Sequence, residues 1–412
     1  MQGEISSYRV LRSQPEYIKL IAANLINRFG DSIDAIAFSL MMYEITNSAS
    51  LVALILGLNY IPTVLLQPLA GALVERLSKK RTMIAFDLVR GAIVAAVVWL
   101  YRAGSLTPGL LIVMTLLIST AESFRVPAGV AIVPMLLKEE CYKVGVALNQ
   151  AVGRATELVG FAAAGGIILL VGRGGALLID VATFALSAAV IAFIRLEETV
   201  TRGRADFRNV LSDFAKGLRL VREHRVLIAL LFVAALINFS TVPLQTFSVP
   251  YVTDWLHGDA SVLSAMQFLV VAGTGIGSVI CPKLTRIRRN TQIVAFGLLQ
   301  SAALLLFGLA VLARDLESRR IVALVACLMF GLSSGVINVV FAAALMRNVP
   351  KEYMARLSGI SNAVMTSAIP AGSFLCSALA AFVKVPVAIA ASAALSFVLF
   401  LGIAGIKTLK NL

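Results

Sequence analysis

Twelve apolar segments, each long enough to cross a lipid bilayer as a helix, follow one another along this chain of 412 residues. About 20 residues in a helix cover the roughly 30 Å hydrocarbon layer of a membrane. The segments begin near Glu16, Ala49, Thr82, Leu106, Lys143, Gly174, Arg225, Ser261, Thr291, Ile321, Leu357 and Val385. Charged residues make up 14% of the chain, against about 25% in soluble proteins. We therefore predict an all-α membrane protein with twelve transmembrane helices, and the composition excludes an ordinary soluble protein.

Basic residues gather at one end of the segments. Most of the 36 Lys and Arg lie in the two terminal tails and in the loops 75–81, 138–143, 195–225, 283–289 and 347–356. Positive residues mark the cytoplasmic side of a membrane protein. We therefore expect both termini to be cytoplasmic. Because topology accounts for the formal charge of +14, we expect no nucleic-acid partner.

The longest polar stretch divides the segments into six and six. We predict an amino-terminal half over 1–195, a cytoplasmic linker over 196–224 and a carboxyl-terminal half over 225–412. Apolar residues at helical spacing over 207–221 indicate an amphipathic helix within the linker. A glycine followed by a basic cluster occurs at Gly71 and again at Gly277, which indicates an internal repeat. Two pseudo-symmetric six-helix halves are typical of carriers with a midplane substrate site.

All charged residues deep within the apolar segments belong to the amino-terminal half, and eight of them form pairs with one spacing. The pairs are Arg28/Asp31, Asp87/Arg90, Glu122/Arg125 and Arg154/Glu157. Residues three apart share a helix face, so each pair can neutralise itself. Ionisable groups in a bilayer are costly unless they are paired or face water, which makes them functional candidates. The alternative is that the pairs only hold helices together.

The first apolar segment carries a polar stripe. Asn24, Asn27, Asp31 and Asp34 follow one another at steps of three, four and three, which places them on one face of a helix. Arg28 can compensate Asp31, and Asp34 is then left without a local partner. We therefore predict that Asp34 exchanges a coupled proton, with a cross-helix ion pair as the alternative.

Acids outnumber arginines at depth in the amino-terminal half. The acids are Asp31, Asp34, Asp87, Glu122, Glu157 and Asp180, and the arginines are Arg28, Arg90, Arg125 and Arg154. The excess carboxyls could be protonated, paired with loop residues, or available to an organic cation. We expect Asp180 to be structural, and the pairs Glu122/Arg125 and Arg154/Glu157 to exchange partners across helices between two states.

The carboxyl-terminal half offers uncharged polar side chains instead. These are Asn238, Gln245, Gln267, Gln300, Asn338 and Asn362. Such groups can orient a ligand of variable shape, and with Asn24 and Asn27 we predict that they line a substrate cavity. Helix-to-helix hydrogen bonds are the alternative. The four cysteines and two histidines form no metal-ligand spacing, so we expect no metal and no cofactor.

The loop from Gly71 to Arg81 resembles the signature that joins the second and third helices of the major facilitator superfamily. Gly71, Leu73, Arg76, Lys79 and Lys80 match that signature, Glu75 replaces its usual Asp, and Ser78 replaces its second Gly. The resemblance implies a gating loop formed by Gly71, Glu75, Arg76, Lys79 and Lys80, together with Asp87 and Arg90 at the start of the third segment.

Further stretches are similar to the exporter branch that includes macrolide efflux pumps and the enterobactin exporter. They read NRFGDSIDAIAF, DLVRG, FRVPAGVAIVP, IDVATFALSA and VPKEYMARLSG. The Gly-Pro-x-x-Gly-Gly pattern common in antiporters of this kind lacks its proline here, because the fifth segment reads GFAAAGG from Gly160.

Together these features predict a proton-coupled exporter of amphiphilic, drug-like or macrolide-like molecules that works by alternating access. We expect it to be a monomer in a bacterial inner membrane. We do not expect it to be an enzyme. No phosphate-binding Gly-x-x-x-x-Gly-Lys-Ser/Thr loop is present, so a gradient must supply the energy. The alternatives are an exporter of a siderophore or lipid-like metabolite, and a transport-dead membrane sensor or scaffold on the same fold.

Overall fold

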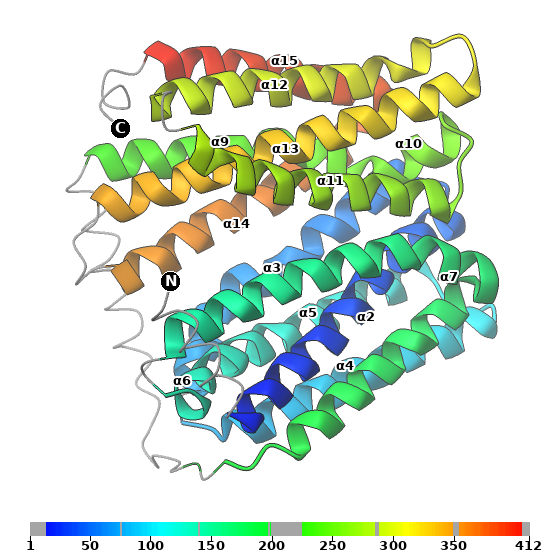
Figure 1. Ribbon diagram of the computed structural model, residues 1–412. Coiled ribbons are helices and arrows are strands. Elements are labelled where there is room, and N and C mark those ends of the chain that lie inside the picture. The colour runs from blue at the N-terminus through cyan, green and yellow to red at the C-terminus, as the bar shows by residue number, and fades with distance from the viewer. Residues whose placement is uncertain are drawn as a thin grey trace. The chain divides into compact units, whose positions relative to one another are not determined.

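The computed structural model describes residues 14–74, 76–138, 141–196, 198, 225–284, 288–348 and 354–405. All regular structure within these ranges is helical (Figure 1). Close contacts divide the chain into two units. The first unit comprises Met1–Met41 and Pro62–Val210, and the second comprises Met42–Ile61 and Leu211–Leu412.

The first unit is built from the helices of the amino-terminal half, apart from residues 42–61. These helices are α2 (Pro15–Thr46), α3 (Ala49–Val74), α4 (Lys79–Arg102), α5 (Pro108–Ala131), the short α6 (Val133–Leu136) and α7 (Tyr142–Ala192). Helix α4 packs against both α5 and α7. Buried apolar side chains of this unit form a hydrophobic core, which includes Tyr17, Met83, Ile132 and Ile191. This packing fixes the helices whose polar faces form the site described below.

Helix α7 contains two of the predicted segments. Its backbone bends at Gly172, where φ is 71°. This left-handed conformation favours glycine because any Cβ would be crowded there. The chain runs toward the bend along one arm of α7 and back along the other, so that the two arms lie on the same side of the bend (Figure 1). The predicted segments near Lys143 and Gly174 therefore correspond to the two arms.

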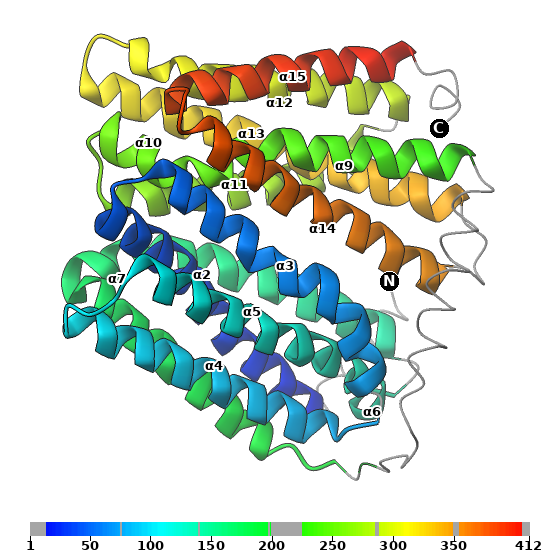
Figure 2. The ribbon, with the colours of Figure 1, turned by 180° about the vertical axis from the view of Figure 1, so that it is seen from behind.

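The second unit holds the remaining helices. They are α9 (Arg225–Thr246), α10 (Ser248–Asp254), α11 (Ala260–Ile280), α12 (Arg289–Leu309), α13 (Leu316–Asn348), α14 (Met354–Leu379) and α15 (Val385–Gly405). Helix α11 packs against α13, α12 against α13 and α15, and α9 against α14. Its apolar core includes Ile293, Val336 and Phe400. Figure 2 shows α9, α14 and α15 from the other side.

Nine helices in the described ranges are long and apolar enough to cross a membrane. Helix α7 counts once among them although it has two arms. Helix α2 is not among the nine because it carries several charged residues. Helix α14 is not among them because its apolar part in those ranges spans only Val364–Leu379. The twelve predicted segments thus all coincide with helices or helix arms, and the predicted all-α membrane fold is confirmed.

The predicted division at residues 195 and 225 stays a prediction. Residues 201–224, with the predicted amphipathic helix, lie outside the described ranges. One finding was not expected from the sequence. The end of α2 and the start of α3, residues 42–61, pack with the second unit, whereas the rest of both helices packs with the first.

Candidate functional site

A polar cavity of about 300 Å³ opens within the first unit. Side chains from α2, α4, α5 and α7 line it. They include the amides Asn24, Asn27, Asn149 and Gln150 and the charged residues Arg28, Asp31, Arg90, Glu122, Arg125 and Arg154. Buried charges in a membrane helix bundle mark ion or substrate paths, because lipid would exclude them. We therefore take this cavity as the candidate site.

The first ion pair of the cavity joins α2 to α4. Arg90 donates to an Asp31 carboxylate oxygen over 2.8 Å, and the Arg90 side chain is only 3% exposed, against 32% for Asp31. The guanidinium also lies over the ring of Phe184, 4.4 Å from its centre. The prediction that Arg28 compensates Asp31 is therefore wrong. The arginine of a neighbouring helix does so.

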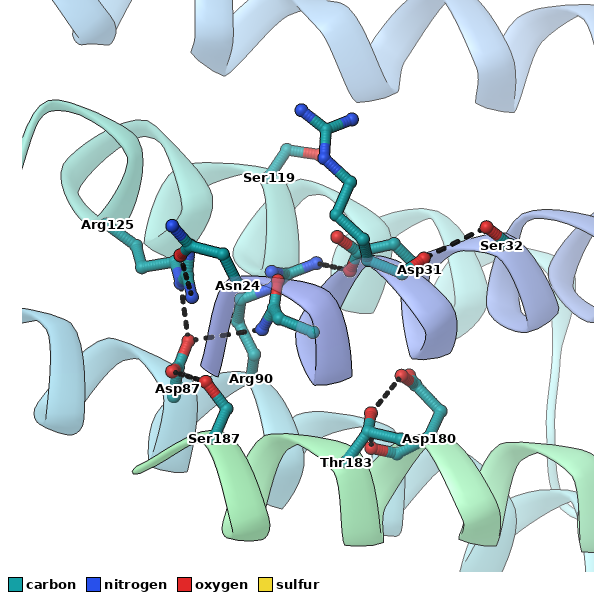
Figure 3. A network of polar contacts seen from close by, with 12 residues as sticks. Asn24, Asp31, Ser32, Asp87, Arg90, Ser119, Arg125, Asp180, Thr183 and Ser187 are labelled. Atoms are coloured by element: carbon teal, nitrogen blue, oxygen red, sulfur yellow. Dashed lines mark hydrogen bonds and ion pairs between the residues drawn. The ribbon is translucent and has the colours of Figure 1, made fainter. Parts of the chain in front are cut away.

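A second ion pair joins α4 to α5 and is the most buried part of the site (Figure 3). Arg125 Nε donates to Asp87 Oδ1 over 2.7 Å, and Ser187 Oγ on α7 donates to Asp87 Oδ2 over 2.7 Å. Longer contacts of 3.4 Å join Asn27 to Asp87 and Arg125 to Asn24. The Asp87 carboxylate thus has partners on three other helices, α2, α5 and α7.

Arg154 and Glu157 form the third ion pair, over 2.8 Å within α7. Of the four predicted pairs, this is the one that forms locally. Asp87 and Arg90 do not bond to each other, although residues three apart in a helix point only about 60° apart around its axis. On α4 that rotation directs Asp87 to α5 and Arg90 to α2. Glu122 and Arg125 are separated on α5 in the same way.

The side chains of Arg28, Glu122 and Asp34 form no hydrogen bond or ion pair with any described residue. Arg28 is exposed and Glu122 is partly buried, and both line the cavity. Asp34 is partly buried on α2 but is not among the lining residues. The predicted absence of a local partner for Asp34 agrees with this geometry.

Asp180 on α7 is fully buried and faces α2. Thr183 Oγ1 donates to the Asp180 backbone carbonyl over 2.7 Å and lies 3.2 Å from its Oδ1 (Figure 3). Asp180 Oδ2 has no partner among the described residues. A Cβ on Gly30 would overlap both the Asp180 carboxyl and the Thr183 hydroxyl, so this glycine allows α2 to lie directly against Asp180.

The predicted gating loop is held by a residue that the sequence did not suggest. Both oxygens of Glu198 accept backbone N–H groups at the start of α4, from Lys79 and Lys80, over 2.8 Å each. A carboxylate there satisfies orphan donors and complements the helix dipole. Lys80 Nζ also donates to the Ile194 carbonyl over 2.7 Å.

The other residues of the predicted loop are divided between three places. Gly71 and Arg76 are partly buried near the end of α3, and Glu75 lies outside the described residues. Asp87 and Arg90 do not belong to the loop. They lie two to three helical turns into α4 and form the interior ion pairs, and their predicted part in gating stays a prediction.

The amides of the second half are scattered. Asn238 is partly buried and donates to the Ala234 carbonyl of its own helix over 3.1 Å. Gln267 is partly buried, Gln245 and Asn338 are exposed, and the side chain of Asn362 lies outside the described residues. Gln300 is buried and donates to Ser334 Oγ over 3.3 Å, a helix-to-helix hydrogen bond of the kind left open as the alternative.

An apolar cavity of about 200 Å³ in the second unit lies between α9, α14 and α15. Its lining includes Phe239, Pro243, Leu375 and Leu395, and none of the six amides named above. Residues that sequence reasoning missed in the first unit are Asn149, Gln150, Thr183, Phe184 and Ser187. The last three belong to the IDVATFALSA stretch, so helical spacing from Asp180 was the available signal.

A bundle of membrane-spanning helices with paired charges around an internal polar cavity defines a multi-pass membrane transporter. The family model of the Major Facilitator Superfamily matches residues 20–373. The chain belongs to this superfamily, and the family predicted from the loop signature is confirmed.

Curated relatives are distant but span most of the chain. Macrolide efflux protein A of Streptococcus pyogenes is 22% identical over 364 residues, which cover 87% of this chain and 88% of that protein. Multidrug efflux pump Tap of Mycobacterium bovis is 24% identical over 367 residues, covering 86% and 85%. The predicted resemblance to macrolide exporters is confirmed by these matches.

Solved structures agree in fold at lower identity. A bacterial homologue of the iron transporter ferroportin, in its inward-facing state, has a TM-score of 0.73 at 16% identity and covers 95% of this chain and 99% of that one. The nucleoside transporter NupG has a TM-score of 0.72 at 12% identity and covers 95% and 98%.

Proposed function

We propose that this transporter is a proton-coupled exporter of amphiphilic small molecules that works by alternating access. One observation carries the proposal. Asp34, Glu122 and Asp180 form no ion pair with any described residue, whereas Asp31, Asp87 and Glu157 each have an arginine. An acid without a cation can gain or lose a proton without breaking an ion pair, so these three are the natural proton carriers of the first unit.

Asp34 is the proposed site of the coupled proton. It shares α2 with Asp31, and its charge interacts with those of Asp180, Asp31, Arg90 and Glu122. Binding a proton there changes the electrostatic balance of the whole charge network. One proton crossing 100 mV supplies about 2.3 kcal/mol, and each unit of pH difference adds about 1.4 kcal/mol. Together these sustain roughly a 500-fold gradient of a neutral substrate.

The substrate class is proposed from the site and from the relatives. The cavity of the first unit supplies Asn24 and Asn27, and the second half supplies Asn238, Gln245, Gln267, Asn338 and Asn362 as candidate substrate contacts. Two relatives are named for macrolide and multidrug efflux, which supports an amphiphilic, drug-like substrate. The gating role of the loop with Glu75, Arg76, Lys79 and Lys80 belongs to the same proposal.

A bacterial inner membrane with both termini on the cytoplasmic side is the proposed location. The distribution of basic loops supports this orientation, and the relatives named above come from bacteria. The proposed partners are the substrate, protons and the bilayer, and the proposed working form is a monomer.

The test compares wild type, Asp34→Asn and Asp259→Asn in proteoliposomes under an imposed pH gradient. Asn keeps the size and hydrogen bonding of Asp but cannot titrate. We expect Asp34→Asn to abolish accumulation against a gradient and to leave substrate binding and downhill exchange intact. Asp259 caps α11 in a loop, so its variant should transport like wild type. Full accumulation by the Asp34→Asn protein would refute Asp34 as the coupling site, and no gradient-driven transport by wild type would refute proton coupling altogether.

A further inference from the structure

Four buried polar atoms of the first unit lack a hydrogen-bond partner among the described residues, and two of them, both in the charge network, are chemically complementary. One is Arg90 Nε, a hydrogen-bond donor, and the other is Asp180 Oδ2, an acceptor. The residues are 3% and 0% exposed. Buried polar groups in proteins are nearly always hydrogen-bonded, so a donor and an acceptor left open in one cluster call for an explanation.

Both side chains belong to the region where α7 meets α2 and α4. Arg90 is stacked over Phe184, which comes one helical turn after Asp180 on α7. On the other side, Gly30 lets α2 contact the Asp180 carboxyl directly, and the next residue of α2 is Asp31, the present partner of Arg90. Arg90 therefore binds the Asp31 carboxylate, and the Asp180 carboxyl belongs to the same cluster.

The charges around Arg90 cannot all be satisfied at once. Its guanidinium interacts electrostatically with Asp31 and Asp34 on α2, Glu122 on α5 and Asp180 on α7. One buried cation cannot neutralise four carboxylates, and an unpaired buried carboxylate is strongly disfavoured. The fully buried Asp180, which has no cation bound, is therefore expected to carry a proton. Asp180 is the most buried of the four, whereas Asp31 is 32% exposed and lines the cavity.

We propose that Asp180 is the second carboxyl partner of Arg90, in exchange with Asp31. In the conformation described here, Asp180 is a neutral acid and Arg90 binds the Asp31 carboxylate. In the other arrangement the proton of Asp180 has moved to Asp31, and Arg90 has moved to the Asp180 carboxylate. The O–H bond at Asp180 breaks and one forms at Asp31, while the guanidinium keeps its charge, so the net charge of the cluster does not change.

This exchange would carry a proton between a buried carboxyl and a cavity-lining one. Asp31 can then release the proton to water in the cavity, which gives the transporter a defined proton path. The part of this path in transport rests on the proposed proton coupling. The exchange itself does not, because it can be observed in the purified protein without substrate or gradient.

The experiment is infrared difference spectroscopy of the purified full-length protein in lipid nanodiscs across a pH series. Wild type should show the carbonyl band of a protonated carboxyl at neutral pH. Asp180→Asn should lose the part of this band that Asp180 contributes, and Asp259→Asn, a loop control, should keep the whole band. A band of unchanged intensity in the Asp180→Asn protein would show that Asp180 is not the protonated group and would overturn the proposal.

Asp31→Asn is the decisive variant, because it leaves Asp180 intact. Without Asp31, Arg90 should bind Asp180, which then ionises, so the Asp180 band should disappear at neutral pH. A merely structural Asp180 would keep its band, and that result would also overturn the proposal.

A second variant should shift the protonation of Asp180 in the opposite direction, and it covers the case in which Asp31→Asn does not fold. Arg90→Gln removes the cation that is exchanged, so Asp180 should stay protonated to higher pH than in wild type. Loss of the band at the same pH as in wild type would contradict the exchange. None of these readouts involves transport, so a failure of Asp34→Asn to block export would refute the coupling site and leave the exchange standing.

Discussion

Arg125 on α5 donates from Nε to Asp87 Oδ1 on α4 over 2.7 Å, and both side chains are almost wholly withdrawn from solvent, at 9% and 0% exposure. Ser187 occupies the other carboxylate oxygen. The pair and Ser187 thus join α4, α5 and α7 beside the cavity, which Arg125 lines. Arg154 and Glu157 offer a contrast within the same unit, because the Arg154 side chain is 66% exposed.

We expect Asp87→Asn to destabilise the protein by about 3–5 kcal/mol, since it leaves the Arg125 charge buried without a counterion. Glu157→Gln should cost about 0–1 kcal/mol, because Arg154 remains solvated. Thermal unfolding of both variants in the same detergent measures the difference. Equal midpoints for the two variants would show that the Asp87–Arg125 pair is not the buried support that its geometry indicates.

These pairs also show which features of the site the sequence predicts and which it does not. Apolar length located the long helices, and intramembrane charge located the charged residues of the cavity. Local spacing did not give their partners, because the rotation between residues such as Asp87 and Arg90 directs them to different helices. Tertiary packing decides which neighbouring helix each side chain meets, and the pattern of apolar residues along one helix does not reveal this.

Small residues show the same limit. Gly30 was visible within a family-like stretch, but its contact with Asp180 depends on how α2 approaches α7. Likewise, Glu198 follows α7 in the sequence and caps α4 from 118 residues or more away. Such contacts join segments that have no common sequence pattern.

The packing of α11 against α13 gives a second prediction. Gly273 and Gly277 on α11 face Gly331 and Gly335 on α13, and a Cβ on any of the four would overlap backbone atoms of the other helix. Small residues four apart allow membrane helices to approach this closely. We expect Gly277→Ala to force the helices apart and to destabilise the protein by about 1–3 kcal/mol, the usual cost of overpacking.

Gly275 provides the matched control. A Cβ there would meet nothing within 4 Å, and alanine favours a helix over glycine by about 0.5–1 kcal/mol. Gly275→Ala should therefore be neutral or stabilising in the same unfolding assay. If Gly277→Ala were equally well tolerated, the close contact of α11 with α13 would be wrong.

The orientation inferred from basic loops is tested by labelling single cysteines in a cysteine-free background. Arg288 and Asp259 are both exposed, at the start of α12 and before α11. We expect Arg288→Cys to react with impermeant thiol reagents only from the cytoplasmic side, and Asp259→Cys only from outside. Lys79 is less suitable because it is buried. Labelling of position 288 from outside in intact cells would show that the inferred orientation is wrong.

The last prediction concerns residues 42–61, which pack with the second unit. Tyr43 donates to Asp254 Oδ2 on α10 over 2.6 Å, and Ser50 donates to the Ser377 carbonyl on α14 over 2.7 Å. Tyr43→Phe removes the first of these bonds and keeps the ring. A net loss of about 1 kcal/mol should raise local opening roughly five-fold. Hydrogen–deuterium exchange of peptides from 42–61 measures it.

Tyr17→Phe is the control for this experiment. The Tyr17 hydroxyl is buried and has no hydrogen-bond partner among the described residues, so its removal should leave exchange over 42–61 unchanged and should not lower the stability of the protein. A double variant, Tyr43→Phe with Ser50→Ala, should increase exchange further, because both contacts hold the same segment. If Tyr43→Phe exchanged no faster than Tyr17→Phe over residues 42–61, the bond to Asp254 would not hold this segment in place.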